Sequence, residues 1–131
     1  MLSKILDNIF YRRKLTGHEI GELGEDIACN YLKSKGYKVL NRNVRVRRNE
    51  IDIIATDNKC AIFVEVKTAT NTEYAASLHV DYEKEDRIKR ASELFLIKRD
   101  VDDLERRYDI IEVYLTPKGK FVSIEHHINA F

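Results

Sequence analysis

Two short segments of this sequence carry acidic and basic side chains at spacings that suit metal-assisted hydrolysis. Glu50 and Asp52 stand in one segment rich in Ile, and Glu65 and Lys67 stand in another rich in Val. Side chains alternate along a strand, so the two charged residues of each segment share one face. If the hairpin turns at Asn58-Lys59 with an even-numbered loop, Asp52 lies opposite Glu65, and Glu50 lies opposite Lys67.

Asp52 and Glu65 are the residues that we expect to hold a metal ion. Opposed residues on antiparallel strands have Cβ atoms about 4.5–5.5 Å apart, and two carboxylates that close repel each other unless a proton or a cation lies between them. Mg²⁺, or Mn²⁺ in its place, suits oxygen ligands and keeps positions for water and phosphate. Such an ion activates a bound water and neutralises phosphate charge. Lys67 would then stabilise the developing negative charge or help to deprotonate the water.

The same pattern has a plainer interpretation. The Ile and Val residues that alternate with the charged ones supply a buried face of their own, so the charges could form the solvent-facing side of an antiparallel sheet. Lys67 would then belong to a surface ion pair. However, Ile54 and Phe63 share the carboxylate face, and charges in a partly apolar setting favour a site.

A helix precedes these strands and carries a further acidic residue. Thr16 and Glu19 have the spacing of a capping box, an apolar stripe follows, and Gly36 suits the left-handed position after the last turn. Glu25 lies at the shoulder of the apolar stripe, beside Ala28, and therefore points along the boundary of the core. There it could add a water-mediated ligand or hold a second ion.

The whole chain is predicted to run in the order helix, helix, three strands, helix and two strands. Residues 1–15 form a short amphipathic helix that docks on the domain or on a partner chain, and residues 16–131 form a single domain. The expected strands cover residues 37–47, 50–55, 60–68, 108–115 and 120–128, the third helix covers 80–98, and turns fall at Arg48-Asn49, Asp57-Asn58 and 116–119.

Length and composition restrict the class of protein. The 131 residues are 34% charged and 44% hydrophobic, with 23 Lys and Arg against 22 Asp and Glu. These values fit one domain with its own core and exclude intrinsic disorder. No run approaches the roughly 18 apolar residues of a membrane span, and residues 1–15 lack the pattern of a signal peptide. We therefore expect a cytoplasmic protein whose Cys29 and Cys60 stay reduced and bind no zinc.

Basic residues are clustered although the net charge is only +1. One cluster surrounds the first strand, where Arg45 and Arg47 share a face; this strip could contact a nucleic-acid backbone or, equally, protect an edge strand. A second cluster begins at Lys84 on the third helix. The candidate nucleic-acid contacts are Arg42, Arg45, Arg47, Arg48 and Lys84.

Several motifs occur together in an order that resembles the bacterial YraN family. That family is similar to the restriction-endonuclease-like PD-(D/E)xK nucleases and, in its core, to archaeal Holliday-junction resolvases. The motifs extend from about Gly17 onward. They are Glu25 within residues 24–28, Asn41-Arg42-Asn43, Glu50-Ile51-Asp52, residues 63–67, Lys84, Arg107-Tyr108-Asp109 and Asn129-Ala130-Phe131.

The resemblance implies an α/β fold with a restriction-endonuclease-like core, in which helices flank a central mixed sheet of about five strands. It implies that Asp52, Glu65 and Lys67 are the catalytic trio and that Glu25 is the acid carried by a helix. Ala69 stands where the family often has Arg, so one phosphate contact is missing from this chain.

Two functions follow as hypotheses. The first is a Mg²⁺-dependent endonuclease that acts on DNA, including branched or structured DNA, and works as a homodimer because two sites must reach two strands. The second keeps the fold without the chemistry, as a module that binds nucleic acid or a partner protein. Neither hypothesis involves a membrane.

Overall fold

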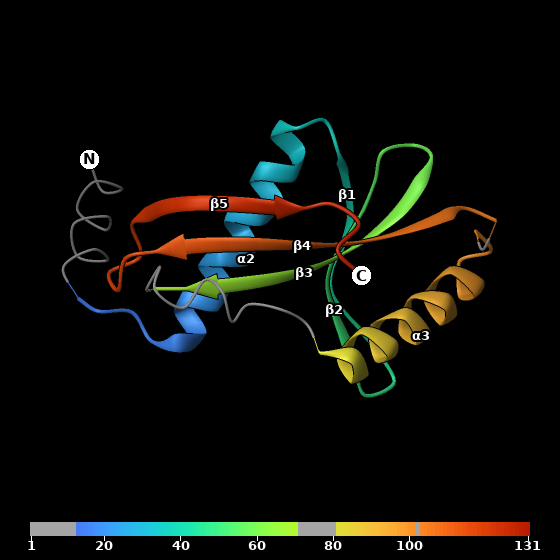
Figure 1. Cartoon of the computed structure of the whole chain (residues 1–131), viewed down its shortest axis with the longest axis horizontal. Coiled ribbons are helices and arrows are strands. Elements are labelled where there is room, and N and C mark those ends of the chain that lie inside the picture. Colours follow the sequence, from blue (N-terminus) through green and yellow to red (C-terminus); the bar gives the residue numbers. More distant parts are fainter. Residues whose placement is uncertain (1–12, 71–80, 102) are drawn as a thin grey trace.

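The structure is a computed structural model that describes residues 13–70, 81–101 and 103–131 (Figure 1). It confirms the α/β class with a five-stranded mixed sheet. The sheet order is β1-β2-β3-β4-β5, antiparallel throughout except for the parallel pair β3–β4. The elements are α2 (Gly17–Ser34), β1 (Lys38–Val46), β2 (Asn49–Thr56), β3 (Cys60–Ala69), α3 (Tyr82–Lys98), β4 (Glu105–Leu115) and β5 (Phe121–His127).

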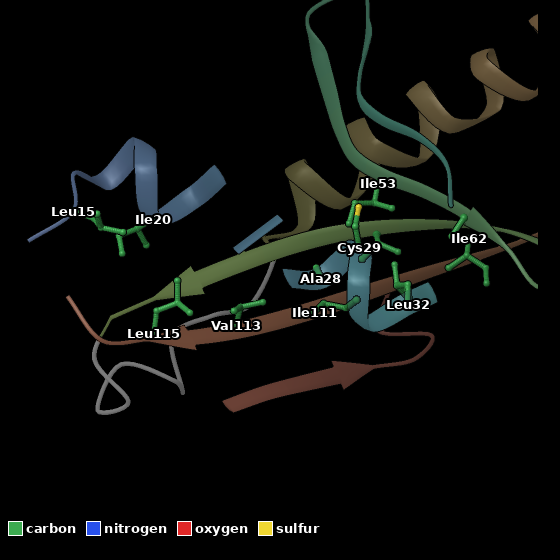
Figure 2. Close-up of a cluster of buried hydrophobic side chains, with 12 residues drawn as sticks. Leu15, Ile20, Ala28, Cys29, Leu32, Ile53, Ile62, Ile111, Val113 and Leu115 are labelled. Atoms are coloured by element: carbon green, nitrogen blue, oxygen red, sulfur yellow. The ribbon is translucent and has the colours of Figure 1, made fainter. Parts of the chain in front are cut away.

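The two helices cover opposite faces of the sheet, and each face has its own apolar core. Figure 2 shows the core beneath α2, where Ala28, Cys29 and Leu32 meet Ile62 and Ile111 of the strands. The second core lies beneath α3, which also supplies the crossover that the parallel pair β3–β4 requires. Its members include Ile54, Phe63, Ile88, Phe95 and Tyr108.

The ends of α2 lie where the sequence predicts them. Glu19 N–H donates to Thr16 Oγ1 (3.2 Å) and Thr16 N–H donates to Glu19 Oε1 (3.0 Å), so the capping box is present. The helix stops at Ser34, and Gly36 takes a left-handed φ of +91°. These local signals determine where α2 begins and ends, and thereby place Glu25 in its middle turns.

Gly24 allows α2 to lie unusually close to β3. A Cβ atom at this position would overlap the side chain of Thr68, so a larger residue requires either that side chain or the helix to shift. Because Gly24 precedes Glu25 directly, the close approach brings the Glu25 carboxylate towards the strand that carries Glu65 and Lys67.

The hairpin between β1 and β2 differs from our prediction. Arg47 and Arg48 form the turn, and Asn49 pairs with Val46, so the turn lies one residue earlier than the predicted Arg48-Asn49. Arg47 adopts a φ of +57°, a conformation that local sequence rules assign to Asn or Gly rather than Arg. The closing pair Val46–Asn49 decides the position of the turn.

Strands β1 and β2 run steeply across the direction of β3, β4 and β5 (Figure 1). We expected Ile51 and Ile53 to share one buried face, and this is wrong. Ile53 packs in the core beneath α2, whereas Ile51 joins Ile54 in the core beneath α3. The paired residues of β2 and β3 end at Ile53 and Val64, and β2 has turned to the other core by Ile51.

The predicted N-terminal helix covers residues 1–15, of which 1–12 lie outside the described part of the chain, and residues 13–15 are not helical. Leu15 is described: it is buried in the core beneath α2, and its N–H donates to Pro117 O (2.9 Å). The start of the third predicted helix, at Val80, also lies outside, and α3 begins at Tyr82 after the N-cap Asp81. Among the described residues, neither helix has the length and apolar character needed to cross a membrane.

Candidate metal centre and nucleic-acid clefts

The candidate site lies where β2 and β3 part. Their antiparallel pairs run from Thr56–Ala61 to Ile53–Val64 and follow the predicted register, but they stop one step before Asp52 and Glu65. At this step Val66 N–H donates to Asp52 Oδ2 (2.9 Å). A side chain thus takes the place of a main-chain bond, which holds the Asp52 carboxylate in the opening between the strands.

An open cleft with a volume of about 620 Å³ lies in this opening. We call it the acidic cleft, because its charged lining residues are carboxylates. They come from three elements: Glu22 and Glu25 from α2, Glu50 and Asp52 from β2, and Glu65 from β3. The further lining residues are Gly17, His18, Ile20, Gly21, Asn43, Val66 and Thr68.

Asp52 is the most perturbed acid of the acidic cleft. Burial, followed by repulsion from Glu65, raises its pKa from 3.8 to about 7, and the hydrogen bond from Val66 only partly offsets this. Burial also raises the pKa of Glu25. The donor set fits Mg²⁺ or Mn²⁺, because carboxylate oxygens are the ligands that such hard cations prefer. A divalent cation between Asp52 and Glu65 would relieve their repulsion.

Two lysines approach Glu65. Lys67 Nζ lies 3.4 Å from Glu65 Oε1, and Lys84 Nζ, from the first turn of α3, is hydrogen bonded to the same oxygen. Burial opposes the charge of Lys84, but the bond to Glu65 outweighs it, so the pKa of Lys84 is raised. The predicted trio of Asp52, Glu65 and Lys67 is therefore gathered at one place, and Lys84 joins it.

Asn43 is a site residue whose position our sequence reasoning missed. It has a φ of +50° within β1, a conformation that Asn tolerates better than most residues. With its amide turned so that the nitrogen faces the carboxylates, it donates to Glu25 (3.1 Å) and Glu50 (3.2 Å). The sequence signal was present in the Asn41-Arg42-Asn43 motif, but only the fold places its last residue between the two acids.

A second cleft, of about 320 Å³, adjoins the first. We call it the basic cleft, because Arg48, Lys84 and Arg87 line it. It shares Glu50, Asp52 and Glu65 with the acidic cleft, so these acids form the wall between the two. Its lining residues are Arg48, Asn49, Glu50, Asp52, Glu65, Lys84, Arg87 and Ile88.

The predicted nucleic-acid contacts are thus divided by the fold. Arg48 and Lys84 line the basic cleft. Arg42 instead pairs with Asp26 on α2 (2.8 Å). Arg45 is exposed on β1, while Arg47 is exposed in the turn, so the predicted face shared by these two along one strand is wrong. The left-handed conformation of Arg47 breaks the alternation on which that prediction depended.

The comparison with known proteins agrees with the motifs. The profile of the uncharacterised protein family UPF0102 matches residues 24–113, a stretch that contains Glu25, Asp52, Glu65, Lys67 and Lys84. This chain belongs to UPF0102. The YraN resemblance is thereby confirmed, since both names denote one family.

Relatives in UPF0102 are similar over most of their length. The chain is 41% identical over 118 residues to a UPF0102 protein of Dictyoglomus turgidum, covering 89% of this chain and 100% of the relative. It is 44% identical over 116 residues to one of Alkaliphilus oremlandii, covering 86% and 97%. A UPF0102 protein of Clostridioides difficile is 39% identical over 118 residues, covering 89% and 100%.

In this UPF0102 member a second aspartate, Asp109 of β4, is fully buried, whereas Asp52 is half-buried; in the sequence Asp109 stands out only as part of a motif. Its carboxylate is fully buried and accepts hydrogen bonds from Arg107 (2.8 and 3.0 Å) and Asn129 N–H (2.9 Å), and lies 2.7 Å from His126 Nε2. Burial would raise the pKa of Asp109, but the bonds from His126 and Arg107 outweigh it and lower that pKa. This cluster ties the C-terminal residues to the sheet.

His126 and His127 are engaged separately. His126 lies against Asp109, whereas His127 Nε2 is 3.1 Å from Glu112 Oε1 and 3.7 Å from Glu125 Oε2. Glu112, Glu125 and His127 have ligand atoms within 4.8 Å of one another, a grouping that the sequence did not indicate. Their mutual ion pairs account for their proximity without an ion.

Proposed function

We propose that this protein is a Mg²⁺-dependent endonuclease that hydrolyses phosphodiester bonds of DNA, with Mn²⁺ able to replace Mg²⁺, and that branched or structured DNA is among its substrates. The observation that carries the proposal is the convergence of Asp52 and Glu65 in an open cleft where the β2–β3 ladder ends. The raised pKa of Asp52 supports it, because the protein itself leaves that carboxylate without a full counter-charge.

The residues divide the chemistry among them. Asp52 and Glu65 would hold the cation, which when bound lowers the pKa of a coordinated water and neutralises phosphate charge. Lys67, 3.4 Å from Glu65, would stabilise the developing negative charge or orient the water. Glu25 enters from α2 and would hold an outer water or a second ion. Arg48 and Lys84, with Arg42, Arg45 and Arg47, would contact the DNA backbone.

The direct test is cleavage of a panel of linear, nicked, flapped and four-way DNA in Mg²⁺ or Mn²⁺. We expect cleavage by the wild-type protein and at least a hundredfold loss, roughly 2.7 kcal/mol of transition-state stabilisation, in Asp52→Asn and Lys67→Ala. Asp103→Asn and Lys98→Ala, both at exposed positions, are the matched controls. If no DNA is cut, or if the Asp52 and Lys67 variants cut as fast as the controls, the proposal is wrong.

A binding module without catalysis is the second candidate. It is favoured by the contact between Lys84 and Glu65, which already neutralises one of the two carboxylates without a metal. Such a module would bind DNA with a steep salt dependence and equally well in Ca²⁺ and in EDTA, because counterion release depends on phosphate contacts alone. Tighter binding in Ca²⁺ would argue for the nuclease.

The proposal includes a homodimer, since two strands of a branched DNA need two sites. Sedimentation velocity of the full chain, and of a chain lacking residues 2–14, tests this part. A monomer at all concentrations would remove the dimer from the proposal and leave the chemistry of the site untouched.

A further inference from the structure

The two adjoining clefts differ in charge. Beyond the shared acids, the acidic cleft adds Glu22 and Glu25 to its lining, whereas the basic cleft adds Arg48, Lys84 and Arg87, which balance the three shared carboxylates. Among the described residues, Lys and Arg side chains that could pair with a phosphate group therefore line the basic cleft and not the acidic one. A phosphodiester that reaches the wall would find its counter-charges only on the basic side.

The basic residues come from two elements that face each other. Lys84 and Arg87 are three positions apart on α3, on the same face as Ile88, and Arg48 belongs to the turn between β1 and β2. Guanidinium groups suit phosphate because they donate two parallel hydrogen bonds. The three basic side chains therefore have the chemistry of a binding site for a phosphate group, which we call the phosphate seat.

Lys84 stands in a position that local helix rules disfavour. It is in the first turn of α3, where its N–H donates to the N-cap Asp81 (2.8 Å), and a cation there opposes the helix dipole. Its ammonium group nevertheless turns to Glu65 rather than to solvent. The side chain is 35% exposed, so it has room to leave this carboxylate without disturbing the core.

We infer that the basic cleft binds a phosphate group of the nucleic acid, and that Lys84 is an exchangeable counter-ion, which neutralises Glu65 until a divalent cation takes that carboxylate and then pairs with the phosphate. This inference rests on the proposed function, because it assigns the cation to Asp52 and Glu65. The Lys84 ammonium group and the divalent cation compete for the Glu65 carboxylate. When the metal ion binds, Lys84 is released at the edge of the phosphate seat. Metal binding and nucleic-acid binding are thereby coupled.

The coupling predicts two measurable effects of removing the charge of Lys84. Removing its charge removes a competitor, so the metal binds more tightly; it also removes a phosphate contact, so DNA binds more weakly. By linkage, a metal that frees Lys84 must strengthen DNA binding by the same factor by which DNA strengthens metal binding. A lysine that serves only to stabilise Glu65 would not produce the loss of DNA affinity.

The experiment compares Lys84→Met with Lys98→Met, which removes the same charge from the exposed far end of α3. Calcium affinity is measured by calorimetry, and affinity for a fluorescent four-way DNA junction by anisotropy, in Ca²⁺ and in EDTA. We expect Lys84→Met to bind Ca²⁺ at least about fivefold more tightly than the control and to lose most of the Ca²⁺-dependent gain in DNA affinity. The slope of log affinity against log salt should fall by about one.

Arg87→Met provides a variant that does not touch Glu65. It should weaken DNA binding while leaving Ca²⁺ affinity within about twofold of the wild-type value, because the ion pair of Arg87 is with Glu83 on its own helix (3.9 Å) and not with Glu65. It also keeps the inference testable if Lys84→Met does not fold.

The inference is overturned if Lys84→Met binds Ca²⁺ no more tightly than Lys98→Met, if its DNA binding keeps the full Ca²⁺ dependence, or if Arg87→Met leaves DNA affinity unchanged. These outcomes are separate from cleavage. If Lys84→Met shows the coupling but no DNA is cleaved, the nuclease proposal is wrong and the counter-ion exchange stands. If DNA is cleaved but Lys84→Met leaves Ca²⁺ affinity unchanged, the exchange is wrong and the nuclease proposal stands.

Discussion

Asp52 and Asp109 are two aspartates at the centre of one sheet with opposite surroundings. The carboxylate of Asp109 accepts hydrogen bonds from Arg107, His126 and the Asn129 backbone, and its pKa is lowered despite full burial. Asp52 accepts a bond from Val66 N–H but also lies beside the carboxylate of Glu65, and its pKa is raised to about 7.

The difference separates a structural acid from a candidate ligand. A buried carboxylate that the protein supplies with donors and cations is satisfied and needs nothing from outside. A half-buried carboxylate that faces another acid, such as Asp52, is left with excess negative charge, so a proton or a metal ion must balance it. The more deeply buried aspartate has the lowered pKa and the less buried one the raised pKa, so the partners decide the direction of the shift.

The largest effect on folding should come from the satisfied acid. Asp109→Ala removes the nearer acidic partner of Arg107 and leaves it the longer contact with Asp57 (3.9 Å), which should lower the free energy of unfolding by about 3–5 kcal/mol. Urea denaturation measures this, with Asp103→Ala at an exposed position as the control, expected to change stability by less than about 0.5 kcal/mol. Equal effects of the two variants would show that the contacts of Asp109 with Arg107, His126 and Asn129 do not stabilise the fold.

Replacing Asp52, whose charge is not balanced, should instead raise the free energy of unfolding. The pKa of Asp52 in the fold, about 7, lies above its ordinary 3.8, so the stability that it contributes is fully present below pH ~4 and is lost as the pH rises through 7. Asp52→Asn keeps an acceptor for Val66 N–H without the charge. It should therefore exceed wild-type stability at pH 8 by about 2–4 kcal/mol and match it at pH 4.

Urea denaturation at the two pH values checks this prediction, and excess Mg²⁺ supplies an internal control. The ion binds the wild-type carboxylates and should reduce the advantage of Asp52→Asn at pH 8. A variant less stable than wild type at pH 8 without metal would contradict the contrast between the two aspartates.

Metal affinity should depend on pH through the same group. Since a cation needs the ionised carboxylate, Asp52 with a pKa of about 7 must lose its proton on binding. Affinity for Mg²⁺ should then rise about tenfold from pH 6 to pH 8, as expected for one proton released near pH 7. Calorimetry in two buffers of different ionisation enthalpy counts the protons; affinity that is flat over this range would contradict the raised pKa.

The smallest effect concerns the acid on α2. The charge of Glu25 adds to the repulsion that raises the pKa of Asp52, so Glu25→Gln should lower that pKa. The change is a secondary one, worth about 1 kcal/mol or less. An NMR titration of the aspartate carboxyl carbons would show Asp52 moving and Asp109 not moving. If the pKa of Asp52 is unchanged in Glu25→Gln, the charge of Glu25 does not act on Asp52.

Much of the fold could be predicted from local sequence signals. The capping box at Thr16 and the glycine at Gly36 mark both ends of α2, and alternating apolar residues mark β2 and β3. The register of β2 and β3, whose pairs end one step before Asp52 and Glu65, followed from the loop length between those strands. These features are predictable because neighbouring residues decide them.

Other parts of the site depend on contacts between distant segments. Arg47 adopts a left-handed conformation that is unusual for Arg, because the pair Val46–Asn49 closes the hairpin there. Lys84 lies nineteen positions from Glu65, and only the packing of α3 brings it to that carboxylate. Nor does any local rule indicate that Asn43 turns towards Glu25 and Glu50.

By itself the sequence determined which residues carry charge, which segments become helices and strands, and which family the chain belongs to, because composition, periodicity and motif order are properties of the linear chain. Tertiary structure alone decided that β2 pairs with β3 only from Ile53 onward and that α2 comes close enough at Gly24 to bring Glu25 to the opening. It also decided that the charge of Asp109 is balanced by basic partners while that of Asp52 is not. The physical reason is that the energy of a buried charge depends on what surrounds it in space, and those surroundings come from segments far apart in the chain.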